Sequence, residues 1–237
     1  MLSLRPYYHP MQSVIPAEEK EVTYTEFLPC EALRPFIYCY WELKSPPRNT
    51  PFFYRVVADG CIDLFFECDN PQMSSLMGYC NTYVEIPIMG AFHYVGVRFL
   101  PSAFPLLFGQ DAFEISAQEI PLREVVPALA TFITQQLGAP LSLPATAQHL
   151  DDYFLRHLSQ HPLQIDNRFF SALSQILQSK GTIHISELNT GISPRQLRRL
   201  FDYYIGDNPK TFSNIVRFQH ILSAKAYHNH SFLDTYY

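Results

Sequence analysis

Two different spacings of hydrophobic residues divide the chain. Over the first part, short runs rich in aromatic and β-branched residues are separated by Gly, Pro and Asn; they cover residues 36–43, 54–57, 61–66, 83–88 and 91–99. Several short runs of this kind are typical of strands in a small barrel or sandwich. After Pro121 the spacing of apolar residues changes towards three and four, which indicates amphipathic helices. The pattern predicts an α+β chain with its strands first and its helices second.

The helical part is itself interrupted. Helical spacing runs over residues 122–137 and 145–158, and Pro162 and Asp166 then mark a linker before a helix over 167–177. We therefore expect a β-rich domain over residues 1–120, linker helices over 121–165 and an all-α domain over 166–237. The leucine-rich stripes of the linker helices fit either an intramolecular core or the seam of a homodimer, and both interpretations stay open.

The clearest local signal is a helix that starts at Ser193. Ser193 is a suitable N-cap, Pro194 occupies the first helical position, and Gln196 completes a capping-box pattern. One face of the predicted helix 193–204 is apolar and consists of Leu197, Leu200, Phe201 and Tyr204. The opposite face carries Arg195, Arg198 and Arg199. The helix is therefore predicted to be anchored on one side and strongly basic on the other.

Three arginines on one short helix have two interpretations. They can form an ordinary solvated face, or they can enter the major groove of DNA, where arginine donates two hydrogen bonds to guanine or clamps a phosphate. The surroundings favour the second interpretation. Gly191 suits a tight turn before the helix, residues 183–188 have helix-compatible apolar spacing, and a further helix follows over 209–227. The pattern predicts a helix-turn-helix.

A family resemblance covers this region. It rests on Glu187-Leu188, Gly191, Ser193, residues 195–201, Gly206, Pro209 and Arg217-Phe218. Residues 183–226 resemble the first half of an AraC/XylS-type DNA-binding domain, a family in which one connecting helix joins two helix-turn-helix units. The resemblance implies a transcriptional regulator that reads double-stranded DNA with the helix 193–204. It implies DNA contacts from Ser193, Arg195, Gln196, Arg198 and Arg199, with Arg199 equally suited to a phosphate.

The sequence departs from that family at its C-terminal end. Residues 231–234 resemble the first helix of the second unit, and the sequence ends at Tyr237 before a second recognition helix. A single unit makes fewer base and phosphate contacts, and each lost base pair of recognition costs about 1–3 kcal/mol. We therefore expect the DNA-binding domain to be incomplete and this chain to bind DNA weakly.

Charge is distributed unevenly along the chain. The net charge of −5 argues weakly against a nucleic acid as partner. Residues 181–237, however, hold 6 basic and 4 acidic residues, whereas residues 1–180 hold 11 basic and 18 acidic ones. A weakly basic C-terminal part on an acidic body fits DNA binding, although the excess is too small to carry the interpretation by itself.

Composition also bears on location. The sequence has no run of about 18 apolar residues, the length that a membrane span needs. Its N-terminus has no apolar signal region. The five cysteines are an odd number without a C-x-x-C pair, which is typical of reduced thiols. We expect a cytoplasmic protein without a membrane partner.

The N-terminal part resembles the sensor domain that precedes many AraC-type DNA-binding domains. The resemblance rests on residues 33–36, Tyr40-Trp41, residues 58–60 and 63–65, and residues 96–99 and 107–109. It implies a cupin-like β-barrel followed by the helical linker and the helix-turn-helix domain. Aromatic strand residues can simply fill a core or can line a pocket for a small-molecule effector. The candidate ligand contacts are Trp41, Tyr40, Arg55, Asp63 and Arg98.

The sequence offers little for catalysis. A metal cupin needs several histidines and a carboxylate from adjacent strands, and only His93 falls in a predicted strand. No nucleophile elbow, phosphate loop or dinucleotide motif is present. We therefore expect no catalytic residue, no metal site, no cofactor and no enzymatic activity. Two alternatives remain: a metal-dependent cupin-type enzyme, and a protein-interaction module that has lost DNA binding through truncation.

Overall fold

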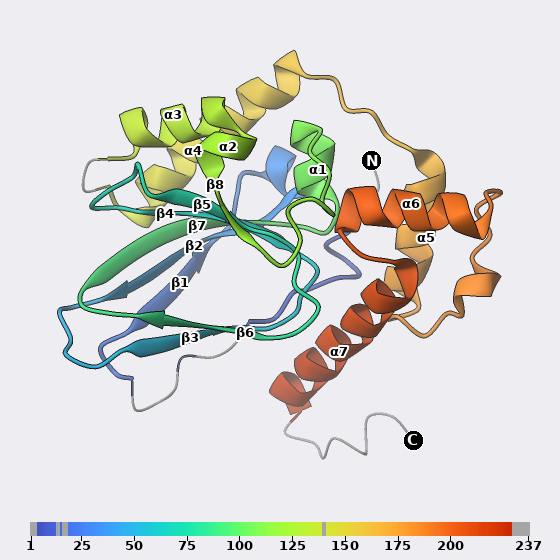
Figure 1. Cartoon of the computed structure of the whole chain (residues 1–237), viewed down its shortest axis with the longest axis horizontal. Coiled ribbons are helices and arrows are strands. Elements are labelled where there is room, and N and C mark those ends of the chain that lie inside the picture. Colours follow the sequence, from blue (N-terminus) through green and yellow to red (C-terminus); the bar gives the residue numbers. More distant parts are fainter. Residues whose placement is uncertain (1–3, 13–14, 16–18, 139–140, 229–237) are drawn as a thin grey trace.

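The computed structural model describes residues 4–12, 15, 19–138 and 141–228. Within these residues the chain forms an antiparallel β-sheet domain followed by helices, as the α+β prediction requires (Figure 1). The strands are β1 (Thr23–Phe27), β2 (Ile37–Ser45), β3 (Phe52–Val56), β4 (Ile62–Glu67), β5 (Ser74–Met77), β6 (Val84–Ile88), β7 (Phe92–Phe99) and β8 (Glu119–Pro121), with a short 3-10 turn, η1 (Glu31–Leu33), before β2.

The strands form two separate sheets. Six of them make one sheet in the order β1-β2-β7-β4-β5-β8, and β3 pairs with β6; every pairing is antiparallel. The prediction of a barrel is wrong, because β1 and β8 stay at opposite edges of the six-stranded sheet and no hydrogen bonds between the described strands close it. The β3–β6 pair instead lies as a second layer below one face (Figure 1).

Alternation along the strands divides their side chains between two cores. On one face of the six-stranded sheet, residues such as Leu64 and Val97 are buried beneath the helices. On the other face, Trp41 and Leu43 pack with Phe52 of β3 in a smaller cluster. The sheet is therefore covered on both sides, by helices above and by the β3–β6 pair below, and most side chains of β2, β4 and β7 are buried.

The helices over the sheet differ in detail from those predicted. They are α1 (Ala103–Phe108), α2 (Leu122–Val125), α3 (Pro127–Gln136) and α4 (Leu143–Gln160). The single helix predicted over 122–137 is interrupted at Val126, whose φ of −133° is not helical, because the following Pro127 disfavours the α conformation at that residue. The sequence did not predict α1, a helix of six residues that contains Pro105.

The remaining helices form what we call the C-terminal helical module, residues 167–228. It contains α5 (Asn167–Gln178), the 3-10 turn η2 (Ile185–Glu187), α6 (Pro194–Ile205) and α7 (Pro209–His228). Its core is aromatic: the ring of Phe201 lies 5.1 Å from that of Phe169 and 6.0 Å from that of Phe212, between ring centroids. One aromatic side chain of α6 therefore holds α5 and α7 together.

The segment before α6 is less helical than its apolar spacing predicts. Residues 183–188 form only the turn η2, closed by a reciprocal capping pair of His184 and Glu187. Such a short segment cannot recover the cost of nucleating an α-helix. The second element of the predicted helix-turn-helix is thus a full helix, and the first is one 3-10 turn. The predicted start of a further unit at residues 231–234 lies outside the described residues.

The helical module packs against the sheet domain through the loop between α1 and β8, residues 109–118. The Ala112 amide donates to the Tyr203 carbonyl at 2.9 Å, and the Ser116 hydroxyl donates to the Gly206 carbonyl at 3.0 Å. This loop therefore contacts the C-terminal end of α6, whereas residues 193–196 at the start of the helix are exposed. None of the helices in the described part of the chain combines the length and the apolar character that crossing a membrane requires.

Candidate functional site

The start of α6 is held by a reciprocal cap. The Gln196 amide donates to the Ser193 hydroxyl at 3.3 Å, and the Ser193 amide donates to the Gln196 side-chain carbonyl at 3.2 Å. Pro194 follows the cap, as the sequence predicts. Both side chains are exposed and could still contact a ligand, but in this structure their role is to fix the first turn of α6.

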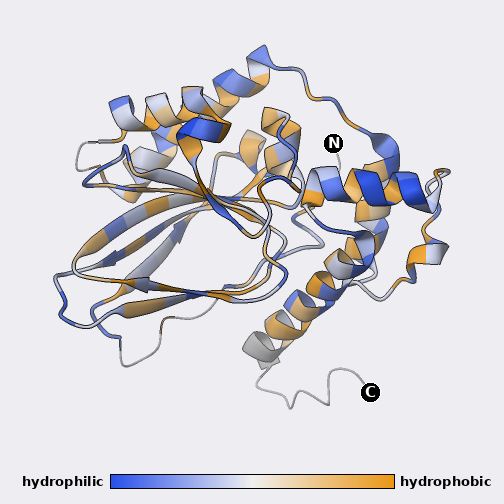
Figure 2. Cartoon of the chain, in the orientation of Figure 1, coloured by the Kyte–Doolittle hydropathy of each residue, from blue (hydrophilic) through white to orange (hydrophobic). Residues whose placement is uncertain are grey.

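The predicted division of α6 into two faces is present in the structure. Leu197 and Phe201 are buried, and all three arginines of the opposite face are exposed: Arg195, Arg198 and Arg199. Figure 2 accordingly shows hydrophilic residues in the first turns of α6. The arrangement places three guanidinium groups within two turns of one helix, all accessible to a partner.

Acidic and aromatic side chains lie beside this basic face. A hollow of about 500 Å³ is lined by residues of α6 and of the loop 109–118, among them Asp111, Phe113 and Arg199. Phe113 is 62% exposed, which is unusual for a large apolar side chain. Burial raises the pKa of the Asp202 carboxyl on α6, while Arg198 acts in the opposite direction. The basic start of α6 is therefore bordered by the carboxylates of Asp111 and Asp202.

A second candidate site lies between the two sheets. A cavity of about 140 Å³ is bounded by the six-stranded sheet and the β3–β6 pair. Its walls are aromatic and aliphatic, and its aromatic members are Trp41, Tyr54, Phe65 and Tyr94. Its charged members are Asp63, Arg98 and Glu119. Three of the five predicted ligand residues, Trp41, Asp63 and Arg98, are thus brought together.

The other two predicted ligand residues are elsewhere, which corrects the sequence interpretation. Tyr40 faces the helices, where its hydroxyl donates to Asp151 of α4 at 2.7 Å. Neighbouring strand residues point to opposite faces, so Tyr40 and Trp41 cannot line the same cavity. Arg55 lies on the outer side of the β3–β6 pair and forms an exposed ion pair with Glu85 at 2.7 Å. Neither side chain lines the cavity.

The indole of Trp41 packs closely against Gly96. A Cβ atom at Gly96 would come within 2.2 Å of the indole Cε2, so only glycine allows this contact. The indole nitrogen donates to the Asp63 carboxylate at 2.8 Å, which fixes the ring in its plane. Trp41 and Gly96 therefore shape one wall of the cavity together.

This contact gives a testable expectation for Gly96→Ala. The added methyl group must displace the indole, and overpacking of this kind typically costs about 1–3 kcal/mol. The sequence has one tryptophan, Trp41, so the fluorescence emission of the variant should shift. The stability of the variant to urea should also fall. Gly90→Ala is the control for the emission, since a Cβ there meets nothing within 4 Å, although its φ of +71° adds a backbone cost and urea stability can fall there too. Unchanged emission in Gly96→Ala would contradict this close packing.

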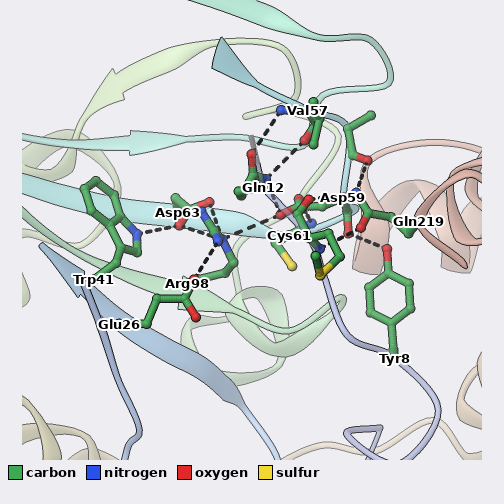
Figure 3. Close-up of polar contacts among 12 residues, drawn as sticks. Tyr8, Gln12, Glu26, Trp41, Val57, Asp59, Cys61, Asp63, Arg98 and Gln219 are labelled. Carbon is green, nitrogen blue, oxygen red and sulfur yellow. Dashed lines mark hydrogen bonds and ion pairs between the residues drawn. The ribbon is translucent and has the colours of Figure 1, made fainter. Parts of the chain in front are cut away.

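Arg98, which is 1% exposed, is the one buried cation among the residues whose burial the structure describes, and carboxylates surround it. Its Nε lies 3.2 Å from an Asp63 oxygen and 3.5 Å from an Asp59 oxygen, and its Nη1 lies 3.8 Å from Glu26 (Figure 3). Burial alone would lower the pKa of Arg98, but Asp63 and its other neighbours hold it well above its usual value. Burial raises the pKa of Asp59, so its proton is held more tightly than that of an exposed aspartate.

Hydrogen bonds continue from this cluster to the C-terminal helical module. The Gln12 side chain donates to Asp59 at 2.6 Å, and the Tyr8 hydroxyl donates to the Asp59 carbonyl at 2.6 Å. On α7, the buried Gln219 side chain donates to the Ala58 carbonyl at 2.8 Å, one residue before Asp59 (Figure 3). The N-terminal segment, β4, β7 and α7 thus meet around one strand end. The sequence contains no signal for this meeting, because its members are far apart along the chain.

The described residues offer no group of three or more His, Cys, Asp or Glu placed to hold a metal ion. His93, the strand histidine, instead contacts the Glu42 carboxylate at 2.8 Å. The five cysteines are free thiols, and burial raises the pKa of Cys39 and Cys61 among them.

Comparison with known proteins identifies one region. Residues 25–121, which run from β1 to β8, match the sequence model of a domain of unknown function, DUF6597. The match covers the β-sheet domain and stops before the linker helices. Comparison with the curated proteins and with the solved structures gave no match. The chain thus contains a DUF6597 β-sheet domain followed by a helical region.

Proposed function

We propose that this protein is a DNA-binding transcriptional regulator of the AraC/XylS type that reads the major groove with α6. The observation that carries the proposal is the exposed start of α6, where Arg195, Arg198 and Arg199 project from a helix whose other face is buried. Recognition helices contact base edges chiefly with their N-terminal residues, and this is the part of α6 that the loop 109–118 leaves uncovered.

The residue types support the same function. Arginine is the side chain best suited to guanine, because its fork of donors matches the two acceptors on the major-groove edge. It is equally suited to phosphates, which position a protein on the duplex without reading sequence. The neighbouring acidic residues Asp111 and Asp202 would repel the phosphate backbone, so the approach of DNA is restricted to the N-terminal end of α6.

Regulation by a small molecule is the second part of the proposal. Arg98, which lines the cavity between the sheets, contacts Asp59. The neighbouring Ala58 carbonyl accepts a hydrogen bond from Gln219 of α7. A ligand can act on DNA binding only if it binds two arrangements of the protein with different free energies. A ligand in this cavity would touch Asp63 and Arg98, and the position of Asp59 and of its neighbour Ala58 depends on them. This contiguity supports a ligand-dependent orientation of the helical module.

DNA binding can be tested by selecting bound duplexes from a random-sequence pool and then measuring affinity for the selected site. Arg195→Ala and Arg198→Ala should each weaken binding by about 1–3 kcal/mol and relax the preference at one base position. Arg123→Ala is the matched control, because it removes an exposed arginine of α2, outside the helical module.

Two results would count against this assignment. If Arg123→Ala weakens binding as much as the α6 variants do, the interaction depends on total charge and not on α6. If the α6 variants weaken binding equally for all sequences, these arginines contact phosphates only, and base reading by α6 is wrong. Absence of any selected sequence at low salt, where phosphate attraction is strongest, would remove the proposed function itself.

A further inference from the structure

The cavity between the sheets has a size that limits its ligand. Its volume of about 140 Å³ is far below that of sites for drug-sized molecules, which span about 300–1,000 Å³. An apolar cavity of about 150 Å³ in another protein holds one benzene molecule. The ligand is therefore a compact molecule of a few heavy atoms, or the compact end group of a larger one.

The charges around the cavity exclude an anion. Arg98 is the one cation of the lining, and its guanidinium is already matched by the carboxylates of Asp63 and Asp59 at 3.2 and 3.5 Å. If both aspartates are ionised, the trio of Arg98, Asp59 and Asp63 carries one excess negative charge, and if Asp59 holds a proton the trio is neutral. In neither state does a free positive charge face the cavity. An anionic ligand would have to break a buried ion pair, which is strongly unfavourable.

The remaining features of the lining favour a cation. Phe65 lies between two other rings, with its centroid 6.4 Å from that of Trp41 and 6.2 Å from that of Tyr94. The faces of aromatic rings attract cations, most strongly where water is excluded. Glu119 of β8 adds a carboxylate to the lining from an exposed position. Aromatic rings, a buried carboxylate and an outer carboxylate thus line one small space.

We propose that this cavity binds a compact organic cation, a protonated or methylated amine, with its charge directed at the ring faces of Trp41 and Phe65 and towards Asp63. The proposal rests on the cavity's proposed role as the effector site of a regulator, and it specifies the chemical class of that effector. Trp41 reports on occupancy directly, because it lines the cavity and the sequence has no other tryptophan.

The test is a titration of Trp41 fluorescence in the full chain with three compounds of similar shape. Tetramethylammonium is the cation, tert-butanol is a neutral counterpart, and pivalate is an anion. We expect tetramethylammonium to bind at least tenfold more tightly than tert-butanol, a difference of about 1.4 kcal/mol, and pivalate not to saturate. Equal affinity for the cation and the alcohol, tighter binding of pivalate, or no saturable binding of any of the three would overturn the proposal.

Variants distinguish the cavity from general surface charge. Phe65→Leu should weaken tetramethylammonium binding several-fold and leave tert-butanol binding nearly unchanged, because leucine keeps an apolar wall but removes the ring face. Glu119→Gln should also weaken binding of the cation. The matched control is Glu124→Gln, an exposed glutamate of α2 that does not line the cavity. If Glu119→Gln and Glu124→Gln have the same effect, the cation is held by overall charge, and the proposed site is wrong.

This experiment is independent of DNA. The chain can bind the cation and fail to select any DNA sequence, in which case the proposed regulator is wrong and the ligand class stands. It can also select DNA and show no preference for the cation, in which case the ligand class alone is wrong.

Discussion

Arg98→Met is expected to lower the free energy of unfolding by about 3–5 kcal/mol. The substitution keeps most of the side-chain volume but leaves the carboxylates of Asp59 and Asp63 buried without their cation. It also removes the partner that balances the desolvation of Asp63 beside Trp41. Unfolding in urea, followed by Trp41 fluorescence and by circular dichroism, measures the loss.

The effect should depend on pH in a defined direction. Burial already raises the pKa of Asp59, so the folded chain favours the protonated form of that group. A raised pKa in the folded state stabilises the fold below the unfolded pKa of aspartate, about 3.9, and this stabilisation is lost as the pH rises. Arg98 acts to lower the pKa of Asp59, so removing Arg98 strengthens the preference of Asp59 for its protonated form. The loss of unfolding free energy in Arg98→Met should therefore be smallest in acid and should grow towards neutral pH.

Arg55→Met is the matched control for this prediction. Arg55 also pairs with a carboxylate in the same β-sheet domain, but its ion pair with Glu85 is exposed on the outer side of the β3–β6 pair. Exposed ion pairs contribute little to stability because water screens them. Two results would contradict the described arrangement of the buried cluster. One is a loss of unfolding free energy in Arg55→Met as large as that in Arg98→Met. The other is a loss in Arg98→Met that does not vary with pH.

Gly206→Ala is expected to destabilise the contact between α6 and the sheet domain by about 2–5 kcal/mol, the sum of a backbone cost and a steric cost. Gly206 ends α6 with a φ of +98°, a conformation that alanine adopts only with strain. A Cβ there would also lie 2.2 Å from the Ser116 hydroxyl and 2.9 Å from the Ala112 carbonyl. The loop 109–118 must therefore move away from α6.

Hydrogen exchange provides the specific measurement for Gly206→Ala. The Ala112 amide, which donates to the Tyr203 carbonyl, should exchange faster in the variant, and urea stability should fall. Gly191→Ala is the matched control: its φ of +69° also requires the left-handed region, but a Cβ there meets nothing within 4 Å. Gly191→Ala should show only the backbone cost of about 1–2 kcal/mol and normal exchange at Ala112. Equal exchange rates of the Ala112 amide in the two variants would mean that the loop 109–118 does not pack against α6 as described.

Local features were predictable because the interactions that produce them span few residues. The cap of α6 involves Ser193 and Gln196, three positions apart, and the buried and exposed faces of that helix follow from its period. The strands β2, β4 and β7 were likewise evident from runs of apolar and aromatic residues. That α6 reads DNA, and that the chain is a regulator of the AraC/XylS type, stay predictions.

The candidate ligand site was only partly predictable. Trp41, Asp63 and Arg98 line the cavity, whereas Tyr40 and Arg55 do not. Strand alternation separates Tyr40 from Trp41, but it cannot say which face is covered by helices and which by a second sheet. Phe65, Tyr94 and Glu119 were not selected as ligand residues, since nothing local distinguishes them from other strand residues.

The amino-acid sequence by itself determined the α+β order of elements, the capped start of α6 and the placing of its arginines opposite its apolar face. Only the tertiary structure decided that the sheet stays open, that Arg98 is matched by Asp59 and Asp63, and that Gln219 of α7 reaches Ala58. The physical reason is the range of the interactions. Caps and periodicity act within about one helical turn, whereas sheet closure and buried ion pairs depend on contacts between segments far apart in the chain.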